Sequence, residues 1–505
     1  MLARVFSCTT VGLDPYLIEV EVDVSGGLPE FTIVGLPDAT VKESKERVRT
    51  AIKNAGFDFP PRKIIVNLAP ADIKKEGPGF DLAIAIGIVA ATGQLNVKYF
   101  ADYIFVGELS LDGSIRSVPG ILPMAMYISE LTARFFIIPH DNQREVSLTS
   151  VQAYSFSKLS EAIEFLEKPQ NYRKVQQQHL RDLLGVEQGV NFDFTDVRGQ
   201  HLAKRALEVA AAGGHNVLLI GSPGCGKSML AKCFPSILPP LTPQESLEVS
   251  KIYSIAGLLS KEKPLIVNRP FRAPHHIASA ASIIGGGIIP KPGEVSLATH
   301  GVLFLDELPE YRRDVLESLR QPLEDRTVSI SRVSAAVTYP AIFQLVGAAN
   351  PCYCGYYGDG QRECTCTPYQ VNKYRNKISG PLLDRIDIQI EVPKLPYQDL
   401  VNKKPEESSW EIQKRVIKAR KRQLARFCDC GLTCNAQMSG REVNKYCQLQ
   451  TEAKDLLKNV YNKLGLSVRA HQRILKVSRT IADLADSEEI NVTHLAEALQ
   501  YRALD

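Results

Sequence analysis

A glycine-rich octapeptide, Gly221-Ser-Pro-Gly-Cys-Gly-Lys-Ser228, limits the fold of this chain more than any other segment. It has the P-loop spacing, in which backbone N–H groups surround phosphates at the N-terminus of a helix. The preceding Val-Leu-Leu-Ile at 217–220 predicts a buried strand, and residues 229–232 can continue into a helix. Since strand, loop and helix follow in the required order, we expect a parallel α/β sheet with a phosphate site at one edge.

The loop residues have separate expected roles in binding ATP and Mg²⁺. Lys227 is expected to hold the β- and γ-phosphates, and Ser228 is expected to ligate Mg²⁺. The glycines let the backbone close around the phosphates. The predicted nucleotide-binding residues of the loop are Gly221, Ser222, Pro223, Gly224, Cys225, Gly226, Lys227 and Ser228.

Two further apolar segments end in polar side chains that suit the same site. Residues 302–305 predict a buried strand, which is followed by two carboxylates. Asp306 suits the Mg²⁺ shell, and Glu307 suits the deprotonation of an attacking water. Another predicted strand, 343–349, ends at Asn350, whose amide could contact that water or the γ-phosphate.

Together these motifs resemble those of the AAA+ ATPases, with the loop as Walker A, Asp306 and Glu307 in Walker B, and Asn350 as sensor 1. A closer similarity to the Mg-chelatase-like branch rests on four segments: Phe271-Arg-Ala-Pro-His-His276, Gly301-Val-Leu-Phe-Leu-Asp-Glu-Leu308, Ala349-Asn-Pro-Cys352 and Gly380-Pro-Leu-Leu-Asp-Arg-Ile-Asp387. Over essentially its whole length, the chain is similar to the bacterial ComM/YifB competence-associated family.

This resemblance implies a ring, most simply a homohexamer, with active sites between subunits. Arg385 matches the arginine finger, which reaches into the neighbouring subunit's site and can be worth a thousandfold or more in rate. Arg469, in Ser467-Val-Arg-Ala470, matches sensor 2. Arg473 lies one helical turn further along and could take that role instead.

Residues 1–167 predict a separate α+β unit. The expected strands and helices lie at 31–34, 63–68, 103–106, 39–55 and 82–91. Segments 74–83 and 106–115 resemble the proteolytic domain of Lon-type proteases, which has a ribosomal S5-like fold. The serine nucleophile of that family falls at Gly79, and the lysine base falls near Leu122. Neither side chain can act in a Ser–Lys dyad, so we expect a domain that assembles a ring or faces DNA.

Composition and the alternation of strand-like and helix-like patterns divide the rest of the chain into three parts. Residues 168–191 are polar and glutamine-rich, which predicts a linker. In 192–395 strand-like and helix-like patterns alternate, so this part predicts the ATPase core, with a parallel sheet covered by helices on both faces. Residues 396–505 predict a helical lid. The expected fold class is therefore a multidomain α/β protein.

Four of the 11 cysteines lie in a glycine-rich loop at 352–366. Their thiolates could form a tetrahedral zinc site. The ligand spacing is C-x-C rather than the usual C-x-x-C, so reduced thiols on a surface loop remain the alternative. The predicted zinc ligands are Cys352, Cys354, Cys364 and Cys366.

Two segments offer cationic contacts for DNA. Residues 414–426 predict a helix that carries a run of cations with no acid among them. A solvated surface helix is the competing interpretation. The glycine-rich stretch 283–293 predicts a β-hairpin. The family resemblance implies an insertion here that faces the central pore, with Lys291 as its cationic contact; a structural loop is the alternative. The candidate DNA contacts are Lys291, Lys418, Arg420, Lys421 and Arg422.

The function that the family resemblance implies is an ATP-driven DNA motor, which performs branch migration of recombination intermediates during natural transformation. Its partners would be single-stranded DNA, branched double-stranded DNA and recombination proteins. The net charge of +4 neither demands nor excludes nucleic acid. No secretory signal is visible, and the longest apolar run, 82–91, is shorter than the roughly 20 residues that cross a bilayer, so we expect a cytoplasmic protein.

Three other functions are compatible with the ATPase motifs. The first is a magnesium-chelatase-type motor that remodels a protein partner, and stimulation of ATP hydrolysis by DNA would distinguish it from a DNA motor. The second, an ATP-dependent protease, is disfavoured by Gly79 and Leu122. The third, a scaffold that binds nucleotide and barely turns it over, is disfavoured by the paired Asp306 and Glu307.

Overall fold

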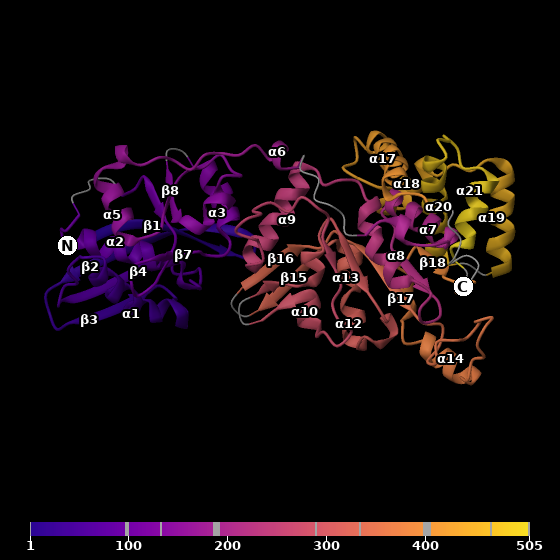
Figure 1. The fold of residues 1–505 in the computed structure, drawn as a ribbon, viewed down its shortest axis with the longest axis horizontal. Coiled ribbons are helices and arrows are strands. Elements are labelled where there is room, and N and C mark those ends of the chain that lie inside the picture. The colour runs from indigo at the N-terminus through magenta and orange to yellow at the C-terminus, as the bar shows by residue number, and fades with distance from the viewer. Residues whose placement is uncertain are drawn as a thin grey trace.

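The computed structural model describes residues 2–95, 100–131, 134–184, 192–287, 290–332, 335–396, 406–464 and 467–502. The elements follow one another along an elongated molecule, with an N-terminal sheet at one end, a second sheet in the middle and a group of helices at the other end (Figure 1). The protein is thus a multidomain chain of mixed α/β structure.

The N-terminal sheet is mixed and has the strand order β3-β4-β2-β1-β5-β8-β9. Its strands are β1 (Leu2–Val11), β2 (Asp14–Ser25), β3 (Glu30–Val34), β4 (Lys63–Ala69), β5 (Tyr103–Phe105), β8 (Phe135–Pro139) and β9 (Gln152–Phe156). Strand β1 pairs with β2 antiparallel along its full length, and β1 pairs with β5 in parallel. A short ribbon is formed by β6 (Glu108–Leu109) and β7 (Ile115–Arg116).

Helices α1 (Ala39–Asn54) and α2 (Asp81–Ala91) agree with the helices predicted at 39–55 and 82–91. The Asp38 carboxylate accepts a hydrogen bond from the Val41 N–H (2.7 Å) and so caps α1. Every residue of α2 is buried, as its continuous apolar run predicts. The other helices of this unit are α3 (Ile121–Glu130), α4 (Gln143–Val146) and α5 (Leu159–Glu167).

The second sheet has five parallel strands in the order β11-β14-β17-β10-β18. They are β10 (Val217–Ile220), β11 (Phe271–Arg272), β14 (Val302–Leu305), β17 (Gln344–Ala349) and β18 (Ile388–Glu391). Side chains alternate between two apolar clusters: Val217 and Leu219 face one side, and Leu218 faces the other. The parallel sheet with helices on both faces, predicted from the alternation along the chain, is therefore confirmed.

Helices and short ribbons surround this sheet. Its helices are α7 (His201–Gly213), α8 (Lys227–Cys233), α9 (Pro243–Ala256), α10 (Ala280–Ile284), α11 (Glu294–Leu297), α12 (Arg313–Ser318), α13 (Arg320–Asp325), α14 (Pro368–Arg375) and α15 (Gly380–Leu383). A longer ribbon consists of β15 (Thr327–Arg332) and β16 (Ala335–Pro340).

The hairpin predicted at 283–293 is present but minimal. Gly285 and Gly286 in β12 pair antiparallel with Pro292 and Lys291 in β13 (Lys291–Pro292). Ile283 and Ile284, the apolar pair before the glycines, end α10 instead of extending the strand. The apolar pair after the glycines, at 288–289, lies outside the described residues. Lys291, in β13, is exposed.

The C-terminal helices pack on the same face of the sheet as α7. They are α17 (Ser409–Arg426), α18 (Gly440–Tyr446), α19 (Thr451–Leu464), α20 (Val468–Leu484) and α21 (Val492–Gln500). At their centre, the fully buried Asp483 of α20 accepts hydrogen bonds from Arg426 Nη1 (2.9 Å) and Asn435 Nδ2 (2.8 Å) and pairs with Arg479 (3.2 Å). The ion pair and hydrogen bonds between Arg426 and Asp483 thus link α17 to α20.

The N-terminal unit and the second sheet are in direct contact. Helix α3 packs on α9, and the Gly120 N–H donates to the Ser254 carbonyl (3.0 Å). The Ser254 hydroxyl donates to Glu145 (2.7 Å), whose pKa burial raises above its ordinary value. Within the predicted linker 168–191, α6 (Leu180–Leu184) is helical, and Leu183 packs against apolar side chains of both units. The two units therefore share apolar and polar contacts.

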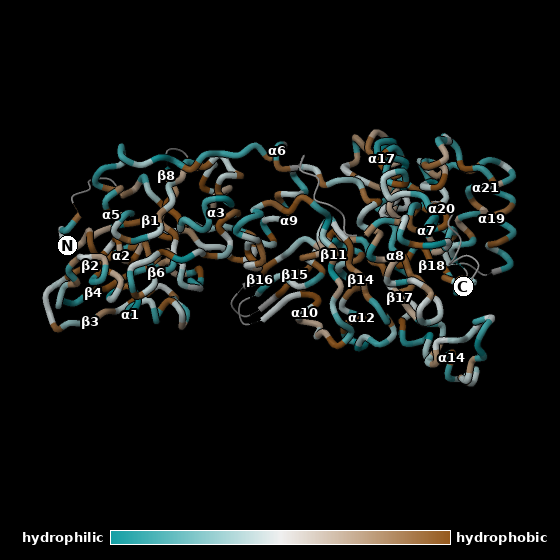
Figure 2. Tube along the Cα trace, viewed as in Figure 1, coloured by the Kyte–Doolittle hydropathy of each residue, from teal (hydrophilic) through white to brown (hydrophobic). Residues whose placement is uncertain are grey.

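Hydrophobic residues concentrate along the strands of the two sheets and on the buried faces of the helices (Figure 2). Helix α2 is apolar throughout, but it has only 11 residues and lies within the N-terminal core. Among the described residues, no helix combines the length and the apolar character needed to cross a membrane.

Candidate functional site

The carboxyl ends of three neighbouring strands form the candidate site. Strands β14, β17 and β10 lie side by side and run in parallel, so the residues that follow them meet at one edge of the sheet. The glycine-rich loop follows β10 and leads into α8, whose first residue is Lys227. The local structure is the strand, loop and helix that the octapeptide predicts.

Four of the predicted site residues meet in pairs at this edge. The Lys227 ammonium donates to the Gly221 carbonyl (2.6 Å) and to Asn350 Oδ1 (3.3 Å). The Ser228 hydroxyl donates to Asp306 Oδ2 (2.8 Å). Lys227 thus contacts the amide of Asn350, which follows β17, and Ser228 contacts the carboxylate of Asp306, which follows β14. A phosphate would fit the first pair and a divalent cation the second, since these donor sets match their chemistry.

The glycines of the loop are required by its backbone. Gly224 (φ +79°) and Gly226 (φ +99°) adopt left-handed conformations, which other residues rarely take. A Cβ atom on Gly221 would lie 2.3 Å from the Val392 carbonyl oxygen. The loop is also held by Gln200, whose side-chain amide donates to the Cys225 carbonyl (3.2 Å) and to a carbonyl at the end of β18. Nothing in the sequence pattern singled out Gln200.

Glu307 is placed differently from Asp306. Its backbone is left-handed (φ +52°), and its side chain is about half exposed at the open edge of the sheet. The Glu307 carboxylate lies 3.4 Å from His276 Nδ1. The rings of His275 and His276 are only 4.2 Å apart, because these residues lie in a turn after β11. Nothing in the sequence pattern indicated that His276 would contact Glu307.

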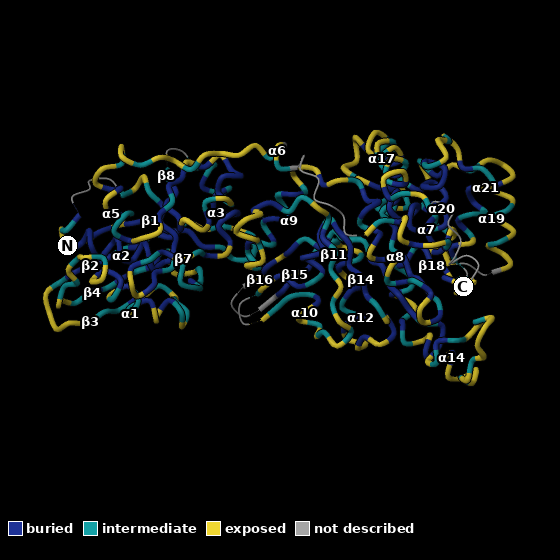
Figure 3. Tube along the Cα trace, viewed as in Figure 1, coloured by how far each residue is buried: buried dark blue, intermediate teal, exposed yellow. Residues whose placement is uncertain are grey.

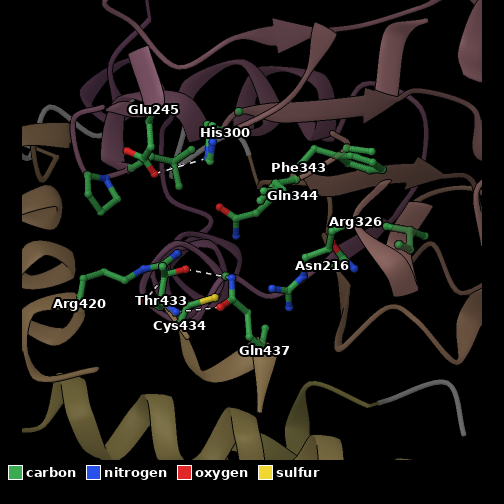
Figure 4. A pocket seen from close by; sticks show the side chains of 18 of the residues that line it. Asn216, Glu245, His300, Arg326, Phe343, Gln344, Arg420, Thr433, Cys434 and Gln437 are labelled. Carbon is green, nitrogen blue, oxygen red and sulfur yellow. Dashed lines mark hydrogen bonds and ion pairs between the residues drawn. The ribbon is translucent and has the colours of Figure 1, made fainter. Parts of the chain in front are cut away.

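Arg385 lies in a different part of the molecule, beside the C-terminal helices. It forms an ion pair with Glu324 and donates to the Pro381 carbonyl (2.7 Å). Together with Arg469 and Arg473 it lines a pocket of about 710 Å³, of which Figure 4 shows the interior. None of the residues of the glycine-rich loop lines this pocket. The candidate finger and both candidates for sensor 2 thus gather in one place, away from Lys227.

The two sensor 2 candidates have different surroundings in this pocket. The Arg469 side chain is 63% exposed, and its guanidinium lies 3.9 Å from Asp384. Arg473 is only 12% exposed, and its guanidinium lies 3.6 Å from Asp387. Burial opposes ionisation of Asp387, yet a hydrogen bond from His215 and the nearby cations hold the pKa of this carboxyl below its ordinary value. Of the two candidates for sensor 2, Arg469 is therefore the arginine that another subunit or a ligand could reach.

The four cysteines of the loop that follows β17 converge. Their sulfur atoms all lie within 4.8 Å of one another, and Cys352 Sγ is 3.3 Å from Cys354 Sγ and 3.6 Å from Cys364 Sγ. The Cys354 N–H donates to Cys366 Sγ (3.4 Å). Four thiolates around a tetrahedral zinc at about 2.3 Å would be about 3.8 Å apart. The donor set and its geometry therefore fit zinc.

Most cations predicted to contact DNA on α17 are engaged within the protein. Lys418 (2.9 Å) and Arg422 both pair with Asp486. Arg420 donates to a carbonyl at the end of α7 and lines the pocket described above. Lys421 is exposed, and within the described chain no carboxylate lies within ion-pair distance of it. The positive run in the sequence is thus largely balanced by acids from other segments.

Profiles of one protein family match most of the chain. The profile described as magnesium chelatase, subunit ChlI, matches residues 193–400. The profile of subunit ChlI of Mg-chelatase matches 20–142, and that of the subunit ChlI C-terminal part matches 406–502. The sheet, the glycine-rich loop and these matches define the class of the protein as a Mg-chelatase-like AAA+ ATPase.

Comparison with individual relatives identifies the family to which the chain belongs within this class. Competence protein ComM of Haemophilus influenzae is 46% identical over 100% of this chain and 98% of its own length. YifB of Escherichia coli is 44% identical over 100% of this chain and 97% of its own length. The magnesium-chelatase 67 kDa subunit of Chlorobaculum parvum is 29% identical over 31% of this chain and 23% of its own length. The chain belongs to the ComM/YifB family.

Proposed function

We propose that this protein is an ATP-driven motor that acts on DNA, with its ATPase site at the edge of the second sheet. The observation that carries the proposal is the meeting of Lys227 with Asn350 and of Ser228 with Asp306. The four residues follow three neighbouring strands, and a bound ligand would replace the partner that each has now. The site thus presents the donors that nucleotide and metal need.

The protein residues divide the chemistry of hydrolysis among them. Bound ATP would supply the phosphoryl group, and Mg²⁺ would offset its negative charge. Lys227 binds the phosphates, while Ser228 and Asp306 hold the metal. Glu307, exposed at the open edge, accepts the proton of the attacking water, and Asn350 orients that water or the γ-phosphate. His276, 3.4 Å from Glu307, orients this carboxylate.

Two arginines complete the site from a neighbouring subunit. Arg385 and Arg469 line the pocket that the glycine-rich loop does not enter, so we propose that they act on the nucleotide of the adjacent subunit in a ring. Arg385 stabilises negative charge on the γ-phosphoryl group, and the exposed Arg469 serves as sensor 2. A homohexamer is the assembly that the AAA+ class favours.

The remaining parts of the chain have supporting roles in the proposal. Residues 1–167 form a Lon-protease-like, S5-type domain without a catalytic dyad, because Gly79 and Leu122 stand at the dyad positions. Residues 168–191 link it to the core at 192–395, and 396–505 form the helical lid. Gly79 lies beside Val118 and Val106 in an apolar environment, which supports an assembly role over proteolysis.

The DNA substrate is proposed from the family, in which one relative is called competence protein ComM. We propose branch migration of recombination intermediates during natural transformation, on single-stranded and branched double-stranded DNA and together with recombination proteins, in the cytoplasm. Lys291, Lys418, Arg420, Lys421 and Arg422 are the DNA contacts proposed from the sequence. Of these, Lys291 and Lys421 are both exposed and without a described ion-pair partner. The alternative is a motor that remodels a protein, as the magnesium-chelatase match suggests.

The ATPase site is tested by Lys227→Ala. Loss of this ammonium removes charge-assisted hydrogen bonds to phosphate, so nucleotide affinity should fall about ten- to hundredfold. A fluorescent ATP analogue titrated into the two proteins measures the change. Lys232→Ala is the matched control, because Lys232 is exposed on the same helix and contacts Phe192 instead of the loop. Equal affinity of Lys227→Ala and the native protein would refute the site.

The substrate class is tested by ATP hydrolysis with and without forked DNA. A DNA motor should hydrolyse ATP faster when the fork is present, and Lys227→Ala sets the background. Hydrolysis that ignores DNA would favour the protein-remodelling alternative.

The cysteine cluster is proposed to hold a structural zinc ion that orders the loop after β17. Protein purified without chelators should contain about one zinc per chain, because the four thiolates already converge. Cys364→Ser should lose most of the metal, and the exposed Cys428, which lies outside the cluster, provides the control variant Cys428→Ser. Elemental analysis that finds well under half a zinc in the native protein would contradict this prediction.

A further inference from the structure

The strongest feature without a role so far is the surface that surrounds the cysteine cluster. Five of the 18 tyrosines of the chain lie between residues 353 and 374. Helix α14, which continues this segment, stands away from the body of the molecule (Figure 1), and most of its trace is exposed (Figure 3). We define the cysteine-loop surface as the exposed side chains of Tyr353, Tyr357, Arg362, Tyr369, Lys373 and Arg375.

The three tyrosine rings of this surface are unusually open to solvent. Tyr353 is 47% exposed, Tyr357 is 48% exposed and Tyr369 is 74% exposed. Aromatic rings normally bury most of their area, so these three rings leave area available to a ligand, although the Lys377 ammonium lies 5.0 Å from the ring centre of Tyr353. Tyr353 is held in place by an edge contact with the buried Tyr374, with ring centroids 4.8 Å apart.

Cations are interleaved with these rings. The Arg362 guanidinium lies 4.3 Å from the ring centre of Tyr356, and that of Arg375 lies 5.2 Å from the ring centre of Tyr357. In the described chain, no carboxylate lies within ion-pair distance of Arg362, Lys373 or Arg375. Among residues 353–375, the one exposed acid is Glu363, beside this surface. Its three free cations contrast with α17, where acids neutralise most of the positive side chains.

The scaffold under this surface is fixed next to the nucleotide site. The converging cysteines join both ends of the loop 352–366. Gly355 packs so closely on Pro223 of the glycine-rich loop that a Cβ atom there would lie 2.7 Å from the proline ring. The Asp359 carboxylate lies beside Ser222 of the same loop. A ligand on the cysteine-loop surface would therefore lie on a segment that contacts the P-loop.

We propose that the cysteine-loop surface binds a single strand of nucleic acid. Bases stack on Tyr353, Tyr357 and Tyr369, and the phosphates pair with the free cations. Stacking on aromatic rings needs unpaired bases and tolerates any sequence, so the surface favours a single strand over a duplex. The inference deepens the proposed function and rests on it for the choice of a nucleic acid as the ligand.

The test uses the full-length protein with Mg²⁺ and a non-hydrolysable ATP analogue. Fluorescence anisotropy measures its affinity for labelled oligothymidylate, oligouridylate and a duplex of equal length. The double variant Tyr357→Leu with Tyr369→Leu should bind both single strands about tenfold more weakly or worse, while duplex binding stays unchanged. The variant with both tyrosines changed to Phe keeps the rings and should bind like the native protein.

A charge variant tests the phosphate contacts separately. Changing Arg362, Lys373 and Arg375 to Gln should lower the slope of log affinity for the single strand against log salt by about 2, since each lost contact removes about 0.7. An unchanged slope would overturn the assignment of phosphates to these cations.

The other outcomes are equally decisive. If the native protein binds single strands and the Leu variant binds them equally well, the surface is wrong and the proposed DNA motor stands. If the Leu variant loses duplex and single strand alike, stacking is overturned. If mass photometry shows that the Leu variant loses its assembly while keeping its strand affinity, the surface is a subunit contact instead. If the native protein binds no DNA at all, both this inference and the proposed function fail.

Discussion

Arg385→Ala is expected to lower the turnover of ATP about a thousandfold while leaving nucleotide binding nearly intact. In the proposed site, Lys227 and the glycine-rich loop hold the phosphates, and none of these residues lines the pocket that contains Arg385. If Arg385 acts on the adjacent subunit as proposed, the transition-state charge on the γ-phosphoryl group loses its partner in this variant. Steady-state hydrolysis and titration with a fluorescent ATP analogue measure the two effects separately.

Mixing two inactive variants tests whether Arg385 acts between subunits. Glu307→Gln should bind ATP and fail to hydrolyse it, because the attacking water loses its base. In rings that contain both variants, some interfaces join an intact Glu307 to an intact Arg385 and should recover part of the activity. ATPase activity per native subunit should also rise with protein concentration, since assembly completes the site.

Arg313→Ala is the matched control for this experiment. Arg313 is an exposed arginine of the same sheet unit and does not line the pocket, so its loss should leave turnover unchanged. Native turnover in Arg385→Ala would show that the finger assignment is wrong. A mixture that stays inactive although subunits exchange would mean either that Arg385 acts within its own subunit or that hydrolysis needs the whole ring intact.

Asp483→Ala is expected to destabilise the C-terminal helices by about 3 to 5 kcal/mol, because it leaves buried cations without a partner. Asp483 is fully buried, and Arg479 is only 2% exposed. Arg426, on α17, also loses its main acceptor in this change. Because about 1.4 kcal/mol is a factor of ten, hydrogen exchange measured by mass spectrometry should show α17 and α20 opening more often by a factor of about a hundred to a few thousand.

The control for this prediction is Asp455→Ala. Asp455 is exposed on α19, and removal of an exposed carboxylate should change stability by no more than about 0.5 kcal/mol. Asp483→Asn keeps the shape and one acceptor and should fall between the two. Unchanged exchange in α17 and α20 of Asp483→Ala would show that the buried charges contribute little to holding these helices together.

The sequence was sufficient where the determining interactions are local. The strand, glycine loop and helix at 217–233 are contiguous, and their conformation follows from glycine freedom and apolar pattern. Helices α1 and α2 follow from their apolar stripe and continuous apolar run. Strand β2 has an equally local pattern that predicts it: Ile18, Val20 and Val22 alternate with polar residues, and all three point into the core.

The tertiary structure alone decided which distant groups meet. Ser228 and Asp306 are 78 residues apart in sequence, and they meet because β10, β17 and β14 are parallel neighbours. Helix α17 shows the opposite case, because its cations stand together in sequence, yet Asp486 and Asp483 from the chain around α20 neutralise several of them. Coulomb and hydrogen-bond energies depend on distance in space. A sequence supplies the charges, and only the packing of its elements places each one beside its partner.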